Sequence, residues 1–284
     1  MHPDAARAHG RDRHSRPARP GPLPAGHRRP PGRERGEPAL ADLFGINDRP
    51  IADAPGETSD LAFAPVEVLP NVHAIKLIGA QAYLLVDRDQ ITLVDAGHAG
   101  SSRMLRGYLA RIGRSMEHIT RIVCTHGHPD HIGGVHEIAA LSGASVFMHP
   151  ADSERLRIRF REVIANFSPG PIVALLTRAP ANATPVADGE ELPVFGGLRV
   201  VHTPGHTPGS ICLYSAERRF VIVGDLLQRV KGKVTLPNYF FTDDMPQARK
   251  SIARLADLDV ETILFSHYAP YRERARETLR ALGS

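Results

Sequence analysis

The chain has 284 residues, 42% of them hydrophobic, which is enough to bury the core of one large domain or two small ones. Its two cysteines, Cys124 and Cys212, exclude a disulfide framework and lie in apolar runs, so we expect buried thiols and a reducing, cytoplasmic location. The formal net charge is +4 with an isoelectric point near 9.3, and no apolar run is long enough to cross a bilayer, so no membrane association is expected.

The positive charge is concentrated in the N-terminal segment. Residues 1–37 hold nine arginines against four carboxylates, a net of +5, so the remaining residues sum to −1. This segment has few large apolar side chains, and burial therefore cannot offset the entropy lost on ordering it. We predict a disordered extension over residues 1–60 and a folded domain over residues 61–284. The near-neutral charge of the domain argues against a nucleic-acid substrate.

From residue 66 onward the pattern changes to short strands. Apolar runs of strand length occur at residues 66–69, 72–77, 82–86 and 91–94. The last run leads into Asp95-Ala96-Gly97. Apolar residues at helical spacing follow, and they predict a helix that Ser101 caps and Gly113 ends. This order of strands, helix and strand is typical of an α/β layer.

The densest group of polar side chains comes next, in Thr125-His126-Gly127-His128-Pro129-Asp130-His131-Ile132-Gly133-Gly134. An apolar run over residues 119–124 predicts a strand before it, and residues 135–141 predict a helix after it. Four potential ligands therefore lie within six residues of one strand-to-helix loop: His126, His128, Asp130 and His131. Imidazoles with a carboxylate are ligands that divalent transition metals prefer, so the loop predicts a metal site.

Further polar side chains follow predicted strands in the second half of the chain. The strands over residues 198–201, 220–223 and 261–265 lead to His206, Asp225 and His267, respectively. A loop between Lys231 and Phe241 is rich in aromatic residues near its end, and it either lines the substrate pocket or packs against the domain. Asp243 or Asp244 is expected to cap the helix after it, with Pro246 in its first turn, and a polar helix over residues 271–282 closes the chain.

The loop at His126 resembles the H-x-H-x-D-H signature of the metallo-β-lactamase-fold hydrolases, and the resemblance covers about residues 66–270. It implies an α/β fold, a four-layer αββα sandwich with a metal site at one edge. The family's upstream Asp, second His loop, bridging Asp and last His match Asp95, His206, Asp225 and His267. Ser266 and Tyr268 depart from the Gly-His-Gly that is more usual at the last position, which leaves the nearby substrate contacts undefined.

The resemblance also implies roles for these residues. One metal ion would be held by His126, His128 and His206, a second by Asp130, His131 and His267, with Asp225 as the bridge. Asp95 would support the site without ligating, and His149, which ends a strand over residues 145–150, is expected to be structural. Zinc is the expected metal, with iron or manganese as alternatives. The segment over residues 151–185 either covers the site, as insertions do in this family, or forms a surface helical hairpin.

The expected function is a hydrolase of the glyoxalase-II/lactonase-like dinuclear branch. A metal-bound hydroxide, oriented by Asp130 as the catalytic residue, would attack a small ester, thioester or lactone. Asp225 favours this branch, because family members that open β-lactams with one Cys ligand place the Cys at that position. Two alternatives remain: a phosphodiesterase or ribonuclease of the same fold, and a mononuclear-iron oxidoreductase resembling the persulfide dioxygenases. The complete ligand set disfavours a degenerate binding protein.

Overall fold

The computed structural model describes residues 66–153, 180 and 182–283. Its first sheet has seven strands in chain order. They are β1 (Val66–Leu69), β2 (Val72–Lys76), β3 (Gln81–Asp87), β4 (Gln90–Val94), β5 (Ile119–Val123), β6 (Ser145–Met148) and β7 (Thr184–Pro185). Strands β1 to β4 pair antiparallel, whereas β4 to β7 pair parallel. The C-terminal ends of β4 and β5 therefore meet at one edge of this sheet.

Helices connect the parallel strands and cover one face of the sheet. They are α2 (Ser102–Arg111), the short α3 (Pro129–Ile132) and α4 (Val135–Ser142), together with the short 3₁₀ turn η2 (Met116–His118). Leu105 and Leu109 of α2 and Ile138 of α4 are fully buried against the strands. This is the helical spacing that the sequence predicted.

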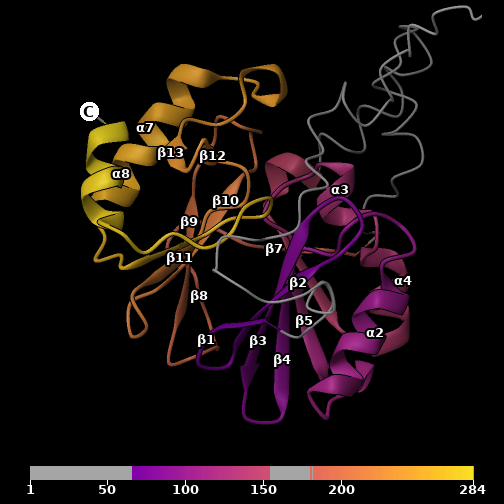
Figure 1. Cartoon of the computed structure of the whole chain (residues 1–284). Coiled ribbons are helices and arrows are strands. Elements are labelled where there is room, and N and C mark those ends of the chain that lie inside the picture. Colours follow the sequence, from indigo (N-terminus) through magenta and orange to yellow (C-terminus); the bar gives the residue numbers. More distant parts are fainter. Residues whose placement is uncertain (1–65, 154–179, 181, 284) are drawn as a thin grey trace, which may run out of the picture. The chain divides into compact units, whose positions relative to one another are not determined.

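The second sheet has five strands in the order β14-β11-β10-β9-β8. They are β8 (Glu191–Leu192), β9 (Leu198–His202), β10 (Ile211–Ser215), β11 (Phe220–Ile222) and β14 (Thr262–Leu264). The remaining elements are a hairpin of β12 (Gln228–Val230) and β13 (Lys233–Thr235), the turn η3 (Tyr239–Phe241), α7 (Met245–Ala256) and α8 (Ala275–Gly283). Figure 1 shows α7 and α8, in orange and yellow, on the outer side of this sheet.

Alternating side chains divide the interior into three cores. Along β3, Leu84 packs with the helices α2 and α4, whereas Tyr83 and Leu85 pack in a core shared by the two sheets. Along β10, Leu213 points into the shared core, whereas Cys212 packs in a third core with α7 and α8. Successive strand residues point to opposite faces, so each sheet is covered on both sides. The predicted four-layer αββα sandwich is therefore confirmed (Figure 1).

The local predictions have mixed outcomes. Asp244 caps α7, because its carboxylate accepts from Gln247 N at 2.9 Å, as predicted. Ser101 stands at the start of α2, but the predicted cap is wrong: its hydroxyl makes no capping bond and accepts from Ile78 N at 3.3 Å. Both Cys124 and Cys212 are fully buried, as expected.

Two predicted segments differ from the structure in the C-terminal part. The loop predicted between Lys231 and Phe241 contains the strand β13, because Lys231 and Gly232 take positive φ angles of 50° and 80° and turn the chain back in the β12–β13 hairpin. The last helix begins at Ala275 and not at residue 271, because Tyr271 exchanges backbone hydrogen bonds with Ile263 at 2.8 and 2.9 Å. That pairing keeps Tyr271 extended.

Two further predictions fall on residues whose structure is not described. The extension predicted over residues 1–60 lies entirely outside the described part, and so does most of the segment over residues 151–185. Within the described ranges, no helix combines the length and the apolar character needed to cross a membrane.

Candidate metal centre

The candidate ligands lie on loops that follow the C-terminal ends of strands from both sheets. After β5, His126 and His128 lie in a loop and Asp130 and His131 lie in the short helix α3 that follows it, and the loop between β9 and β10 carries His206. Asp225 and His267 come from neighbouring strands of the second sheet. In the parallel pair of β11 and β14, Ile222 stands opposite Leu264, and the two candidate ligands each lie three residues further on. Sheet register thus places them side by side.

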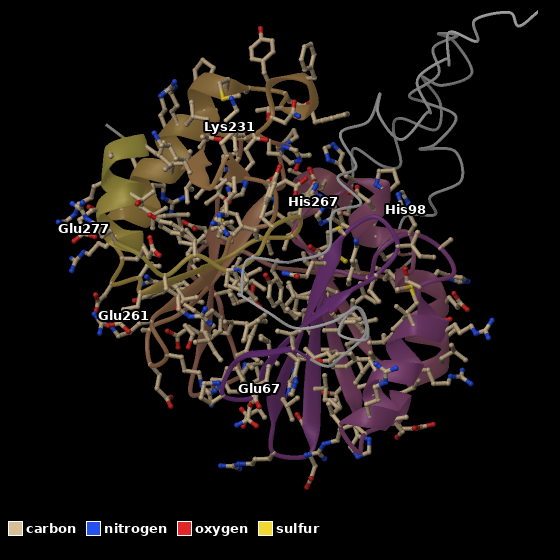
Figure 2. All side chains as sticks on the ribbon, viewed as in Figure 1. Glu67, His98, Lys231, Glu261, His267 and Glu277 are labelled. Carbon is tan, nitrogen blue, oxygen red and sulfur yellow. The ribbon has the colours of Figure 1, made fainter. Side chains whose placement is uncertain are left out.

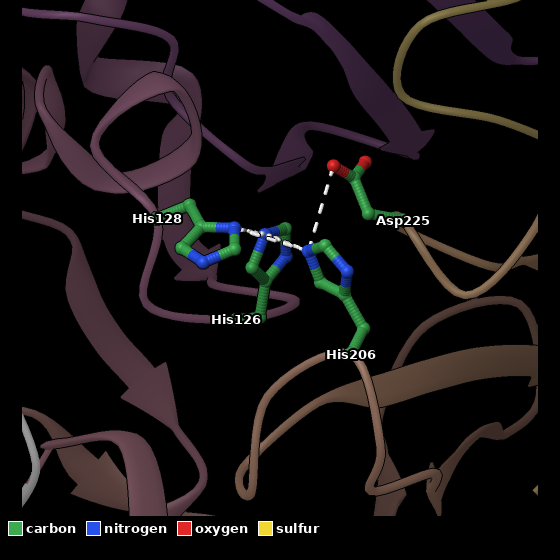
Figure 3. A group of neighbouring side chains, drawn as sticks. All are labelled: His126, His128, His206 and Asp225. Carbon is green, nitrogen blue, oxygen red and sulfur yellow. Dashed lines mark hydrogen bonds and ion pairs between the residues drawn. The ribbon is translucent and has the colours of Figure 1, made fainter. Parts of the chain in front are cut away.

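The first group consists of three histidines and Asp225. His206 Nε2 lies 3.2 Å from His126 Nε2 and 3.0 Å from His128 Nδ1. His126 Nε2 and His128 Nδ1 are 3.0 Å apart. Asp225 Oδ2 lies 3.7 Å from His206 Nε2. Figure 3 shows the three imidazoles turning these nitrogens toward one point, with the carboxylate next to His206.

The second group consists of Asp130, His131 and His267. Asp130 Oδ2 lies 3.5 Å from His131 Nε2 and 3.4 Å from His267 Nε2. Asp225 also faces this group, because its Oδ1 is 3.5 Å from His131 Nε2 and its Oδ2 is 3.3 Å from His267 Nε2. The structure therefore brings all seven predicted ligands together in the two predicted groups, with Asp225 between them. Figure 2 labels His267 where the two halves of the sandwich meet.

Two histidines of the first group, His126 and His206, are held in the neutral form by their surroundings. Burial lowers the pKa of His126 well below its usual range, and the neighbouring imidazoles lower it further. Burial also lowers the pKa of His206 to about 3, although Asp225 opposes the change. A metal ion binds only the unprotonated imidazole. At neutral pH these two histidines therefore carry no extra proton that would have to leave before a metal ion binds.

The second group holds charges of both signs. Burial alone would lower the pKa of His267, but Asp225 and Asp130 outweigh it and raise that pKa to about 10. The pKa of His131 is likewise raised, because Asp130, Asp225 and Asp95 outweigh its burial. Burial would raise the pKa of Asp225, but His267 and His131 hold it well below its usual range. Without a metal ion, protons balance the carboxylate charge in this group, and a bound cation would replace them.

The donor atoms fit divalent metal ions. His131 Nε2 and Asp225 Oδ1 are buried and make no hydrogen bond within the part of the chain that the structure describes. Buried polar atoms are almost always hydrogen-bonded, so two such atoms facing one another mark a place where another group belongs. Imidazole nitrogens with carboxylate oxygens are donors that zinc, iron and manganese accept.

The ring nitrogens on the far side of these histidines bind the protein. His131 Nδ1 lies 2.8 Å from Asp95 Oδ2, and His126 Nδ1 lies 3.1 Å from Thr125 Oγ1. Asp95 also accepts from Thr125 N and Thr125 Oγ1, both at 2.8 Å. Such contacts fix ring orientation and tautomer. Asp95 thus lies in a supporting position and belongs to neither group of candidate ligands, which is the arrangement that the resemblance implied.

Asp152 is a residue that the sequence reasoning missed. It is 1% exposed and lies in the helical turn just after β6. Its carboxylate accepts from Gly127 N, Thr207 Oγ1 and Gly209 N, each at 2.7 Å. It therefore ties the loop of His126 to the loop of His206. The approach is close, because a Cβ atom on Gly209 would lie 2.5 Å from Asp152 N. Its only signal in the sequence is its position two residues after the His149-Pro150 pair that follows β6.

His149 lies outside both ligand groups, as expected for a structural residue. Its ring stacks on that of His202, with centroids 3.9 Å apart and an angle of 11° between the planes. His202 Nε2 lies 2.9 Å from Pro208 O, so the stacked pair supports the loop that carries His206.

The end of β14 is anchored to the first sheet. Tyr83 Oη donates to Phe265 O at 2.7 Å, and Gln81 Nε2 donates to the same oxygen at 3.0 Å. Gln81 N donates to Ser266 O at 2.6 Å. The backbone directly before His267 is thus held by β3, and all these contacts are buried.

Comparisons with known proteins agree with this geometry. The family model of the metallo-beta-lactamase superfamily matches residues 76–267. The probable metallo-hydrolase YflN of Bacillus subtilis is 26% identical over 237 residues, covering 75% of this chain and 89% of YflN. The probable metallo-hydrolase YqgX of the same organism is 31% identical over 151 residues, covering 53% and 67% of the two chains.

A solved structure is similar as well. The metallo-beta-lactamase family protein TTHA1429 from Thermus thermophilus superposes with a TM-score of 0.62 at 26% identity, covering 75% of this chain and 79% of that one. The fold, the clustered histidines and carboxylates and the matched family model lead to one conclusion: this chain belongs to the metallo-beta-lactamase superfamily.

Proposed function

We propose that this protein is a metal-dependent hydrolase that cleaves a small ester, thioester or lactone, with a pair of divalent ions, most simply zinc, held by the two ligand groups. The observation that carries the proposal is the position of Asp225, whose carboxylate oxygens lie 3.3–3.7 Å from His131, His206 and His267. A carboxylate that faces both groups is suited to bridge two ions. Iron or manganese would suit the same donors.

The residues of the centre would bind the metal ions and orient the attacking water. His126, His128 and His206 would hold one ion, and His131, His267 and Asp130 the other. Bound ions of this kind supply Lewis acidity, which activates water and polarises a carbonyl group. Asp130 is ionised, since neighbouring histidines outweigh its burial and keep its pKa below its usual range. Its carboxylate therefore accepts hydrogen bonds and would orient the attacking water.

A thiol mechanism has no support in this arrangement. Burial raises the pKa of Cys124 well above its usual range and that of Cys212 to about 12. A nucleophilic cysteine needs the opposite shift, together with access to solvent. Both thiols are therefore assigned to packing.

The charge of the loops favours a carbonyl substrate over a phosphodiester. The ligands lie on the loops over residues 125–134, 202–210, 224–227 and 266–270, and residues 238–244 contact His206. None of these five described segments contains a lysine or arginine. Enzymes that bind phosphate groups usually supply such cations. We therefore propose a small-molecule substrate and no nucleic acid.

The proposal is tested with purified protein loaded with zinc, manganese or iron. Ester, thioester, lactone, β-lactam and bis-p-nitrophenyl phosphate substrates are compared before and after metal removal by a chelator. We expect metal-dependent turnover of at least one carboxylic substrate class, with phosphodiester turnover lower by about 10²-fold or more. Exclusive phosphodiester cleavage, or oxygen consumption by a protein that retains a single iron, would contradict the proposal.

A further inference from the structure

Three consecutive aromatic side chains stand in solvent beside the metal centre. Tyr239, Phe240 and Phe241 form η3 and are 74%, 90% and 51% exposed. We call residues 238–242 the aromatic turn. Single exposed apolar side chains are ordinary, but a contiguous group of large ones marks a binding surface. The sequence alone left open whether this segment was packed, and the structure shows that Tyr239 and Phe240 are largely exposed, whereas Phe241 is half-buried.

The aromatic turn is fixed in place and not loosely attached. The Asn238 side chain accepts from Phe240 N at 3.0 Å, and Thr242 Oγ1 donates to Asn238 O at 2.7 Å. The same hydroxyl lies 3.4 Å from His206 Nδ1, and Asp243 N donates to His206 O at 3.2 Å. The turn is therefore bonded on its C-terminal side to a candidate metal ligand.

The second ligand group also has an exposed apolar side chain near it. Ile78, 44% exposed, lies in the turn between β2 and β3. The next residue, Gly79, approaches the second ligand group so closely that a Cβ there would lie 2.8 Å from Asp130 Cβ. Ile78 O accepts from His98 N at 2.8 Å, and Figure 2 labels both His98 and His267 at this edge. Exposed apolar side chains thus border both ligand groups.

We infer that the aromatic turn binds an apolar acyl group of the substrate, a medium-length alkyl chain or an aryl ring next to the carbonyl that is cleaved. This inference rests on the proposed hydrolase function and specifies its substrate class. Rigid aromatic side chains offer a large apolar contact at little entropic cost, since the turn is already ordered. The same surface offers no cation to a negatively charged acyl group, because the aromatic turn contains no lysine or arginine.

The first test compares octanoyl and acetyl thioesters as substrates of the metal-loaded full chain. The wild-type protein is expected to prefer the octanoyl thioester in kcat/KM. Phe240→Ala should lower the ratio of octanoyl to acetyl kcat/KM by about tenfold, the scale of a lost apolar pocket contact. Phe240→Leu should restore part of it. Leu141→Ala removes another exposed apolar side chain, 40% exposed on α4, and should leave the ratio unchanged.

The second test needs no turnover. Octanoate and acetate are titrated into each variant and followed by calorimetry, with size-exclusion chromatography in parallel. Octanoate should bind the wild-type protein more tightly than acetate, and Phe240→Ala should remove most of that difference. If no acyl substrate is cleaved but octanoate binding still depends on Phe240, the hydrolase proposal fails and the acyl site stands.

Two outcomes would overturn the acyl site while leaving hydrolysis intact. One is that thioesters are cleaved, but Phe240→Ala changes neither the ratio of octanoyl to acetyl kcat/KM nor the binding of octanoate. The other is a loss of dimers in Phe240→Ala with the same unchanged ratio, which would show that the turn is an interface between copies of this chain.

Discussion

Asp130 and Asp152 are two carboxylates near the candidate metal centre that have different hydrogen-bond partners. Asp130 faces His131 and His267 and is one of the candidate ligands, whereas Asp152 accepts only from backbone and hydroxyl groups of the loops themselves. Removing the charge from each carboxylate therefore tests two different roles, that of a ligand that also orients water and that of a support for the ligand loops.

Asp130→Asn should reduce kcat by on the order of 10²-fold or more, because the amide cannot serve as an anionic hydrogen-bond acceptor for the attacking water. Its similar shape should preserve the fold. Steady-state kinetics on one hydrolysable substrate, with metal content measured on the same sample, checks this. Cys124→Ser is the control and should cost stability only. An inactive Cys124 variant beside a fully active Asp130 variant would mean that the chemistry depends on a thiol.

Asp152→Asn should weaken metal binding by roughly 10- to 100-fold, as the loss of contacts that orient ligands usually does. The amide nitrogen cannot accept, so at least one of the three 2.7 Å bonds between the loops is lost. Competition with a chromogenic chelator measures the affinity. Asp89→Asn, at a side chain that is 95% exposed, is the matched control. Equal affinities in the two variants would show that Asp152 does not position the ligands.

All seven candidate ligands could be found from the sequence, because each follows an apolar run that ends in a motif of the family. Asp152 could not, because a carboxylate that binds loop backbones needs no fixed neighbours and leaves no pattern. The capping role predicted for Ser101 was wrong for a related reason. The sequence shows that a hydroxyl group stands at the start of a helix, but not that this hydroxyl accepts a hydrogen bond from Ile78 N.

At the level of elements, strand periodicity located the sheets and helical spacing located α2 and α7, since both patterns report burial directly. The start of α8 was misplaced because the bond between Tyr271 and Ile263 joins positions whose pairing has no local signature. The β12–β13 hairpin was missed because its turn uses Lys231 at a positive φ, where glycine or asparagine is the usual signal.

The stacked pair at the ends of β6 and β9 predicts a pH effect on stability. Burial and the neighbouring His202 lower the pKa of His149 below its ordinary 6.5, although Asp152 and Asp188 oppose the change. The unfolded chain therefore takes up this proton first as the pH falls. The contribution of His149 to the free energy of unfolding is complete above pH 6.5. It is lost as the pH falls below 6.5 toward the pKa of His149 in the folded state.

His149→Phe keeps an aromatic ring over His202 but cannot take up a proton. The free energy of unfolding of this variant, relative to that of the wild-type protein, should therefore rise between about pH 8 and about pH 5.5. Urea denaturation of both metal-free proteins at the two pH values measures the change. Protonation of the metal-ligand side chains affects the two proteins equally and therefore cancels in the difference. A difference that does not vary with pH would refute the assignment.

At the scale of the whole molecule, the candidate metal centre joins the two sheets. The loop after β5 belongs to the first sheet, whereas His206, Asp225 and His267 follow strands of the second. Bound ions would therefore connect both halves and stabilise only the folded state. The αββα arrangement itself was implied by the family resemblance of the metal-binding motifs, and strand and helix patterns alone indicated no more than an α/β layer.

Metal removal should consequently lower the melting temperature. Ions at about 1,000 times their dissociation constant add about 4 kcal/mol to the free energy of unfolding. For a domain of this size that corresponds to a shift of roughly 8–16 °C. Calorimetry before and after chelation, followed by zinc re-addition, measures it. Asp225→Ala should show a smaller shift and fewer than two bound ions. A stable plateau at one ion in the wild-type protein, unaffected by that substitution, would exclude a shared centre.

The buried bonds from Gln81 and Tyr83 to the backbone ahead of His267 also bear on how such a chain can diversify by recombination. A crossover between β6 and β8 would join the first sheet of one parent to the second sheet of another. The last ligand would then take its position from a glutamine and a tyrosine inherited from the other parent. Parents that differ there would misplace His267 even when each carries all seven ligands. The centre is thus inherited as one unit, whereas the aromatic turn lies within a single parental segment and can be exchanged alone.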